Sequence, residues 1–173
     1  MTEPLPALAL SVRQPSAWAI IHGGKEVENR SLGSIRAGRM GPGRIAIHAS
    51  IGMKREEYDY LVWRWQRDGV HTPRPDALPR RAIIGTVEVV DVITESDSLW
   101  FGGEAGLLLR NPEPCVPVPA SGALGYFRWE ASGALADPLP WMRDWGASDG
   151  GLFEDLPVAH KEDPTKPFGR KKI

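Results

Sequence analysis

The chain has 173 residues, of which 42% are hydrophobic and 25% charged, and its formal net charge is −1. This length suits one domain with a real core, and the near-neutral charge argues against a protein coated in basic residues for bulk nucleic-acid binding. The sequence shows no membrane-length apolar stretch, no secretory signal and only one cysteine, so we expect a cytoplasmic protein without an internal disulfide or a membrane partner.

The first elements are short. Residues 7–12 read as a strand, and Pro15 suits the first position of a helix that ends at Gly23-Gly24 after about two turns. Val27 anchors a second strand over residues 25–30. Residues 31–43 are rich in glycine and have no apolar period, which predicts a loop.

The middle of the chain carries the clearest periodicity. Residues 44–50 alternate as a strand. Residues 54–68 form a predicted helix whose apolar stripe lies at helical spacing; the stripe consists of Tyr58, Leu61, Val62 and Trp65. Gly69 ends this helix, and the proline-containing segment 70–80 is a stiff connector.

Residues 82–93 are rich in valine and isoleucine, which predicts a long central strand of a closed or strongly curved sheet. Residues 105–109 and 123–129 are further predicted strands, separated by the proline-rich stretch 112–119. This order predicts an α+β fold: a small mixed β-barrel of five to six strands with two or three helices packed outside. Residues 140–145 look helical, and residues 146–173 look loosely held.

Charge is distributed unevenly along the chain. Residues 1–81 carry 13 Lys and Arg against 8 Asp and Glu, a net charge of +5, whereas residues 82–173 carry 8 against 14, a net charge of −6. A phosphate-facing patch is therefore expected in the first half, with the arginine-containing segment 36–44 as part of it. The alternative is that these arginines are scattered on the surface.

Five blocks of sequence resemble the ASCH domain family, which is related to the PUA and EVE barrels. They are LSVRQP (10–15), GGKEVENR (23–30), GRIAIHAS (43–50), AIIGTVEVVD (82–91) and PVPASGALGYF (117–127). The resemblance implies a PUA-like ASCH domain over residues 1–130, with residues 131–173 as a C-terminal extension. One position departs from the family pattern, because Ser16 stands where an aromatic residue is common and Trp18 follows two residues later.

Lys25 is the first candidate site residue, because it follows the glycine turn and its amine is able to hold a phosphate or act as a base. Glu28 is the second candidate catalytic residue, and Arg30 is a candidate for binding phosphate or a base edge. Strict strand alternation places Lys25 and Glu28 on opposite faces. A common site therefore requires an irregular strand start, which Gly24 permits. The alternatives are a solvated turn lysine and an outward Glu–Arg pair.

Other candidate nucleic-acid-binding residues follow from the same blocks and from the aromatic content; they are Arg13, Gln14, Trp18, Arg44, His48, Ser50 and Trp100. Gln14 has the alternative of capping the first helix. His48 and Ser50 either line the same cleft as Arg44 or face water. The histidines and the cysteine show no metal-ligand spacing, so neither a metal nor a cofactor is expected.

The resemblance implies a protein that holds single-stranded RNA or a modified nucleobase in a cleft beside the barrel. The alternative is a hydrolase that acts on RNA or modified nucleosides, either a ribonuclease or an amidohydrolase of N4-acetylcytidine. Some ASCH amidohydrolases use a lysine, a threonine and a glutamate. Lys25 matches the lysine, but Glu28 replaces the threonine. An adaptor with a disused cleft is a further alternative.

Overall fold

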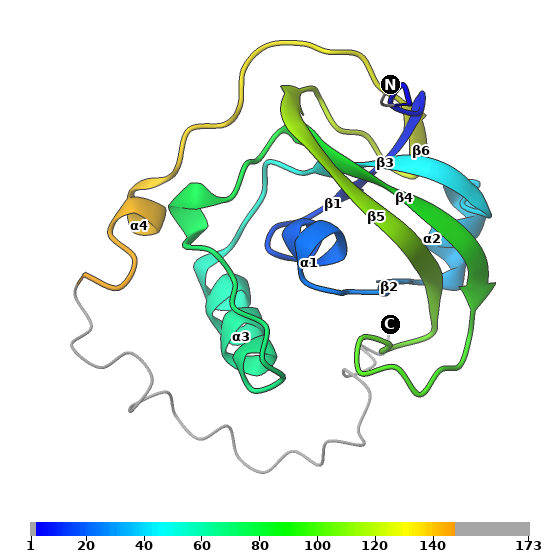
Figure 1. Cartoon of the computed structure of the whole chain (residues 1–173), viewed down its shortest axis with the longest axis horizontal. Coiled ribbons are helices and arrows are strands. Elements are labelled where there is room, and N and C mark those ends of the chain that lie inside the picture. The colour runs from blue at the N-terminus through cyan, green and yellow to red at the C-terminus, as the bar shows by residue number, and fades with distance from the viewer. Residues whose placement is uncertain (1–2, 148–173) are drawn as a thin grey trace.

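A six-stranded mixed sheet forms the body of the computed structural model, which describes residues 3–147 (Figure 1). Its strands are β1 (Leu8–Val12), β2 (Val27–Arg30), β3 (Gly43–Ala49), β4 (Ala82–Ile93), β5 (Ala105–Pro119) and β6 (Tyr126–Arg128). Their spatial order is β2-β5-β4-β3-β1-β6, and every neighbouring pair is antiparallel except the parallel pair of β1 and β3. The sheet curls into a half-barrel with β2 and β6 at its edges. The expected α+β class and curved sheet are confirmed, whereas the barrel is open and not closed.

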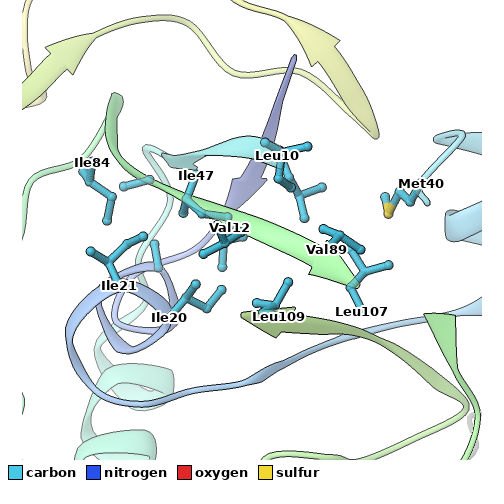
Figure 2. Close-up of a cluster of buried hydrophobic side chains, with 14 of the residues drawn as sticks. Leu10, Val12, Ile20, Ile21, Met40, Ile47, Ile84, Val89, Leu107 and Leu109 are labelled. Carbon is cyan, nitrogen blue, oxygen red and sulfur yellow. The ribbon is translucent and has the colours of Figure 1, made fainter. Parts of the chain in front are cut away.

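Helix α1 (Ser16–His22) fills the curve of this sheet (Figure 1). Its Ile20 and Ile21 belong to the main apolar cluster, together with side chains from β1, β3, β4 and β5 (Figure 2); Leu10, Val12, Ile47, Ile84, Val89, Leu107 and Leu109 are members. Burying this surface is the main favourable term in folding. The helix therefore packs inside the curve, and not outside it as predicted.

A second apolar cluster joins the clearest predicted helix to the C-terminal part of the described chain. Helix α3 (Arg55–Gln66) buries Tyr58 and Val62 against Met142 of helix α4 (Pro140–Arg143) and Leu78, which follows the short helix η1 (Pro75–Ala77). The helices expected at 54–68 and 140–145 are thus present. The loose tail was predicted for residues 146–173, and all of it from residue 148 onward lies outside the described residues. Among residues 3–147, the helices are too short or too polar to cross a membrane.

The glycine-rich segment 31–43 differs from the prediction, because it contains helix α2 (Leu32–Ala37). Ser31 caps this helix, since its side chain accepts a hydrogen bond from the backbone N–H of Ser34 at 3.1 Å. Ile35 is buried in the main apolar cluster. One cap and one buried side chain therefore offset the low helix propensity of the glycines.

Strand β5 is also longer than predicted, because it continues through the proline-rich stretch 112–119. Only its first part, Ala105–Leu108, pairs with β2, whereas its remainder pairs with β4 alone. Proline lacks the N–H of a central strand but is tolerated where one side of a strand has no partner. The prediction treated these prolines as a break and missed this one-sided pairing.

Candidate functional site

Lys25 lies just before β2, in a turn that sets the direction of its side chain. Gly24 has a φ of +76°, and the backbone N–H of Lys25 donates to the carbonyl of Ala19 at 3.0 Å. Because the strand begins only at Val27, strand alternation does not apply to Lys25. Its side chain is only 7% exposed, and its Nζ lies 3.5 Å from Oε2 of Glu28 and donates to the carbonyl of Val27.

Glu28 joins Lys25 to Arg30. The Nε and Nη2 atoms of Arg30 lie 3.2 and 3.1 Å from Oε1 of Glu28. Arg30 Nη2 also donates to the backbone carbonyl of Ser11 on β1, at 2.7 Å. We call Lys25, Glu28 and Arg30 the charge cluster. Two cations and one carboxylate give it a formal net charge of +1.

Trp100, in the loop between β4 and β5, contacts Lys25 of the charge cluster. The centroid of its ring lies 5.8 Å from Lys25 Nζ, within the range of a cation–π contact, and 5.3 Å from the Trp65 ring of α3. Asn29 holds this loop in place. Its side-chain amide donates to the Trp100 carbonyl at 2.8 Å, and its side-chain oxygen accepts from the N–H of Gly102, also at 2.8 Å.

The charge cluster and Trp100 offer a defined set of chemical functions. Arg30, with 23% of its side chain exposed, and the half-buried Trp100 are accessible to a ligand, whereas Lys25 and Glu28 lie beneath them. The arginine provides a planar cationic donor, and the indole provides a surface for stacking. Among residues 3–147, no group of three or more histidine, cysteine, aspartate or glutamate side chains is placed to hold a metal ion.

Three residues predicted for the site are engaged elsewhere near α1. Arg13 pairs with Glu57 at 3.2 Å. Gln14 is buried, donates to the carbonyl of Pro79 and accepts from the N–H of Trp18, so it has the alternative capping role. Trp18 stacks on His22 and packs against the second apolar cluster. These contacts hold α1 to its neighbours.

Arg44, His48 and Ser50 do not join the charge cluster either. Arg44 lies 3.5 Å from Glu3 and 3.8 Å from Glu113 in exposed ion pairs. Glu28 pairs with Leu107 of the main apolar cluster, which places it on the α1 side of the sheet. His48 contacts Phe127 on the opposite side, where a third, smaller apolar cluster lies. The residues that the sequence analysis assigned to one site therefore lie on two different faces of the sheet.

His48 and Ser50 line a cavity of about 410 Å³ on that opposite face. Its lining consists of Ser11, His48, Ser50, Ile51, Arg81 and residues 121–124. Burial lowers the pKa of His48 below the ordinary value of 6.5; the hydrogen bond with Ala120 opposes this shift, and the charge of Arg81 adds to it. We call this space the serine–histidine cavity.

The prediction missed Asn29, Ser11 and Arg81. Asn29 acts through a loop 71 residues away in the chain, and no local pattern signals that contact. The direction of Ser11 could have been inferred from the sequence. Its neighbours Leu10 and Val12 face the main apolar cluster, so strand alternation directs Ser11 to the other face of the sheet. Nothing in the sequence pointed to Arg81. Its unusual backbone, with a φ of 59° at a non-glycine residue, is visible only in the structure.

No protein-family model matches the chain, and no curated protein matches its sequence. The relation to the ASCH family therefore stays a prediction from the five sequence blocks. These blocks fall on β1 and the turn before α1, on the turn before β2 and β2 itself, on β3, on β4, and on the segment from the end of β5 into β6. The residues that suggest the family are thus the residues that build the sheet and the charge cluster.

Proposed function

We propose that the protein is an ASCH-type binding protein for single-stranded RNA or a modified nucleobase. The observation that carries this proposal is the net positive charge cluster beneath the partly exposed ring of Trp100. Aromatic stacking combined with an arginine donor is the chemistry by which proteins hold unpaired bases. Arg36 and Arg39 are exposed and add positive charge in the same half of the sequence, whereas Arg44 is paired with Glu3 and Glu113.

The arrangement assigns different tasks to the four side chains. Trp100 stacks on a base, and Arg30 donates to a phosphate or to the edge of that base. Lys25 lies beneath, where it adds positive charge and supports the Trp100 ring. Glu28 fixes the direction of the Arg30 guanidinium through its two close contacts. Because few phosphates are contacted, binding is expected to be weak to moderate and to depend on salt.

A second candidate function is hydrolysis of RNA or of a modified nucleoside such as N4-acetylcytidine. The observation that favours it is the pairing of Lys25 Nζ with Glu28 Oε2 at 3.5 Å in a site where both side chains are nearly buried. Such a pair is able to move a proton to or from a substrate. Glu28 occupies the position at which the amidohydrolase pattern has threonine, so the nucleophile in this reading is a water molecule.

Fluorescence anisotropy of short labelled single-stranded RNAs over a range of salt concentrations tests the first function. We expect Trp100→Ala and Arg30→Gln to weaken binding, and Arg30→Gln to lower the salt slope by roughly 0.7. Arg128→Gln on β6 is the matched control, because it removes an equally positive, exposed strand residue. Equal affinities in all variants with intact thermal stability contradict the proposed site. Single-turnover assays on N4-acetylcytidine and on the same RNAs test the second function.

A further inference from the structure

We propose that the serine–histidine cavity is a second binding site, for a small organic anion that has an apolar body. The cavity lies on the face of the sheet opposite the charge cluster, and it does not depend on RNA binding. Its volume of about 410 Å³ falls within the range that small-molecule sites occupy. Four kinds of side chain line it: hydroxyls, an imidazole, a cation and exposed aliphatic groups.

The hydrogen bonds of His48 identify which polar groups are already satisfied. Its Nε2 lies 2.8 Å from the carbonyl oxygen of Ala120, and a carbonyl only accepts, so Nε2 carries the proton. In the neutral ring, Nδ1 then accepts from the hydroxyl of Ser11, which lies 2.9 Å away. The lowered pKa of His48 agrees with a neutral ring. Ser11 and His48 thus form a fixed, uncharged floor.

Ser50 and Ser121 supply the donors that remain. The Ser50 hydroxyl oxygen is buried and has no hydrogen-bond partner among the described residues. A buried hydroxyl without a partner costs free energy. Because this oxygen is screened from solvent, the Ser50 side chain rotates toward the cavity when it donates to a ligand acceptor, and the new hydrogen bond removes that cost. Ser121 Oγ accepts from Nη2 of Arg81 at 2.9 Å, so its own proton is free to point at a ligand.

Arg81 gives the cavity its charge preference. Besides Ser121, its guanidinium donates to the backbone carbonyls of Ser132 and Ala134, at 2.7 and 3.0 Å. All three partners are neutral, so they orient the guanidinium without neutralising it. A cation held beside free hydroxyl donors favours a carboxylate or a phosphate.

The rim of the cavity favours an apolar body on the ligand. Ile51 and Leu124 both line it, and these residues are 60% and 98% exposed. An apolar ligand body that covers them removes apolar surface from water, which favours binding. Gly122 keeps the floor uncovered, because a Cβ at this position would lie 2.7 Å from both Ser11 Oγ and His48 Cε1.

Amide chemical-shift titration of the full chain tests this inference with three probes: benzoate, phenyl phosphate and the uncharged benzyl alcohol. We expect one or both anions to shift the amides of residues 50–51 and 121–124 at about millimolar concentration. Benzyl alcohol should bind about tenfold more weakly, because it lacks the charge that Arg81 recognises. The stronger of the two anions shows whether the site prefers carboxylate or phosphate.

Two variants locate the site. Ser50→Ala removes only the hydroxyl without a partner, so we expect about tenfold weaker anion binding with unchanged thermal stability. Gly122→Val fills the floor and should abolish binding. Arg110→Gln, which removes an exposed cation of β5 that does not line the cavity, is the control and should bind the anions as the unmodified protein does. The inference is overturned if neither anion shifts these amides, if benzyl alcohol binds equally well, or if Ser50→Ala and Gly122→Val both bind normally.

Discussion

Arg30 of β2 donates to the backbone carbonyl of Ser11 on β1 across 2.7 Å, although four steps of the strand order separate the two strands. No backbone pairing joins β2 and β1 among the described residues, so this side chain spans the open side of the half-barrel. The same guanidinium contacts Glu28 in the charge cluster. A single arginine thus contributes both to closure of the fold and to the proposed binding site.

Replacing Arg30 by alanine should therefore lower the free energy of unfolding by about 2 kcal/mol, because a charge-assisted hydrogen bond is lost and Glu28 loses one of its cations. Urea unfolding followed by circular dichroism measures this change. Arg44→Ala is the control, since its ion pairs are exposed and contribute about 0–1 kcal/mol. Equal losses in the two variants would show that the contact between β2 and β1 adds no stability.

Two substitutions of Lys25 separate the contribution of its packing to stability from the contribution of its charge. We expect Lys25→Met to lower the free energy of unfolding by about 2 kcal/mol, because Glu28 loses one of its two cations although an apolar chain of similar volume fills the space. Lys25→Ala should cost about 1–2 kcal/mol more, because it also leaves a void beside Trp100. Thermal melts of the two variants give the comparison, and identical melting temperatures would contradict it.

The same Lys25→Met variant distinguishes the two proposed functions. If the protein only binds RNA, affinity should fall about fivefold, the effect of losing one nearby cation in water. If it hydrolyses N4-acetylcytidine through Lys25 and Glu28, single-turnover product formation should disappear. If Lys25→Met binds RNA with normal affinity and the unmodified protein shows no turnover, Lys25 has neither role.

Stability should fall as the pH drops below about 6.5, because the pKa of His48 is lower in the folded protein than its ordinary value of 6.5. Between these two pKa values the unfolded chain binds a proton that the folded protein does not, so stability rises with pH and is lost on acidification. Urea unfolding between pH 5 and 8 measures the slope. His48→Gln should flatten it, whereas His22→Gln at an exposed position should leave it unchanged.

Asn29→Ala should release the loop that carries Trp100, because both hydrogen bonds of the side-chain amide are lost. We expect weaker RNA binding and a shift of the tryptophan emission, with a change in unfolding free energy of about 1 kcal/mol. Asn111→Gly is a suitable control, since that side chain, in the middle of β5, bonds to the exposed Glu88 of β4 and glycine tolerates its φ of 51°. Unaltered emission and affinity in Asn29→Ala would show that the amide does not position Trp100.

The sequence predicted those elements whose periodicity is strong. Helix α3 begins and ends within two residues of the predicted range, and β4 has the predicted bounds. It did not predict α2 or the second part of β5. In α2 one Ser31 cap and one buried Ile35 decide the conformation, and in β5 the missing partner on one side decides it. Both depend on tertiary contacts that local propensity does not report.

The candidate site was predictable to the extent that it is local. Lys25, Glu28 and Arg30 lie within six residues, and the glycine turn before them permitted the irregular strand start that a common site requires. The approach of Trp100 was not predictable in its geometry, because it depends on Asn29 at a separation of 71 residues. The sequence also grouped His48 with this site, although the sheet places it on the other face.

The second part of β5 has a further consequence for how the protein behaves at high concentration. Four of its eight residues from 112 to 119 are prolines and have no N–H to offer. This edge therefore cannot complete a ladder of hydrogen bonds with a strand of another molecule, although Val116 on it is 84% exposed. Prolines of this kind protect an exposed edge from strand-by-strand aggregation. The prolines that obscured the strand in the sequence thus make this edge a poor partner for a strand of a neighbouring molecule.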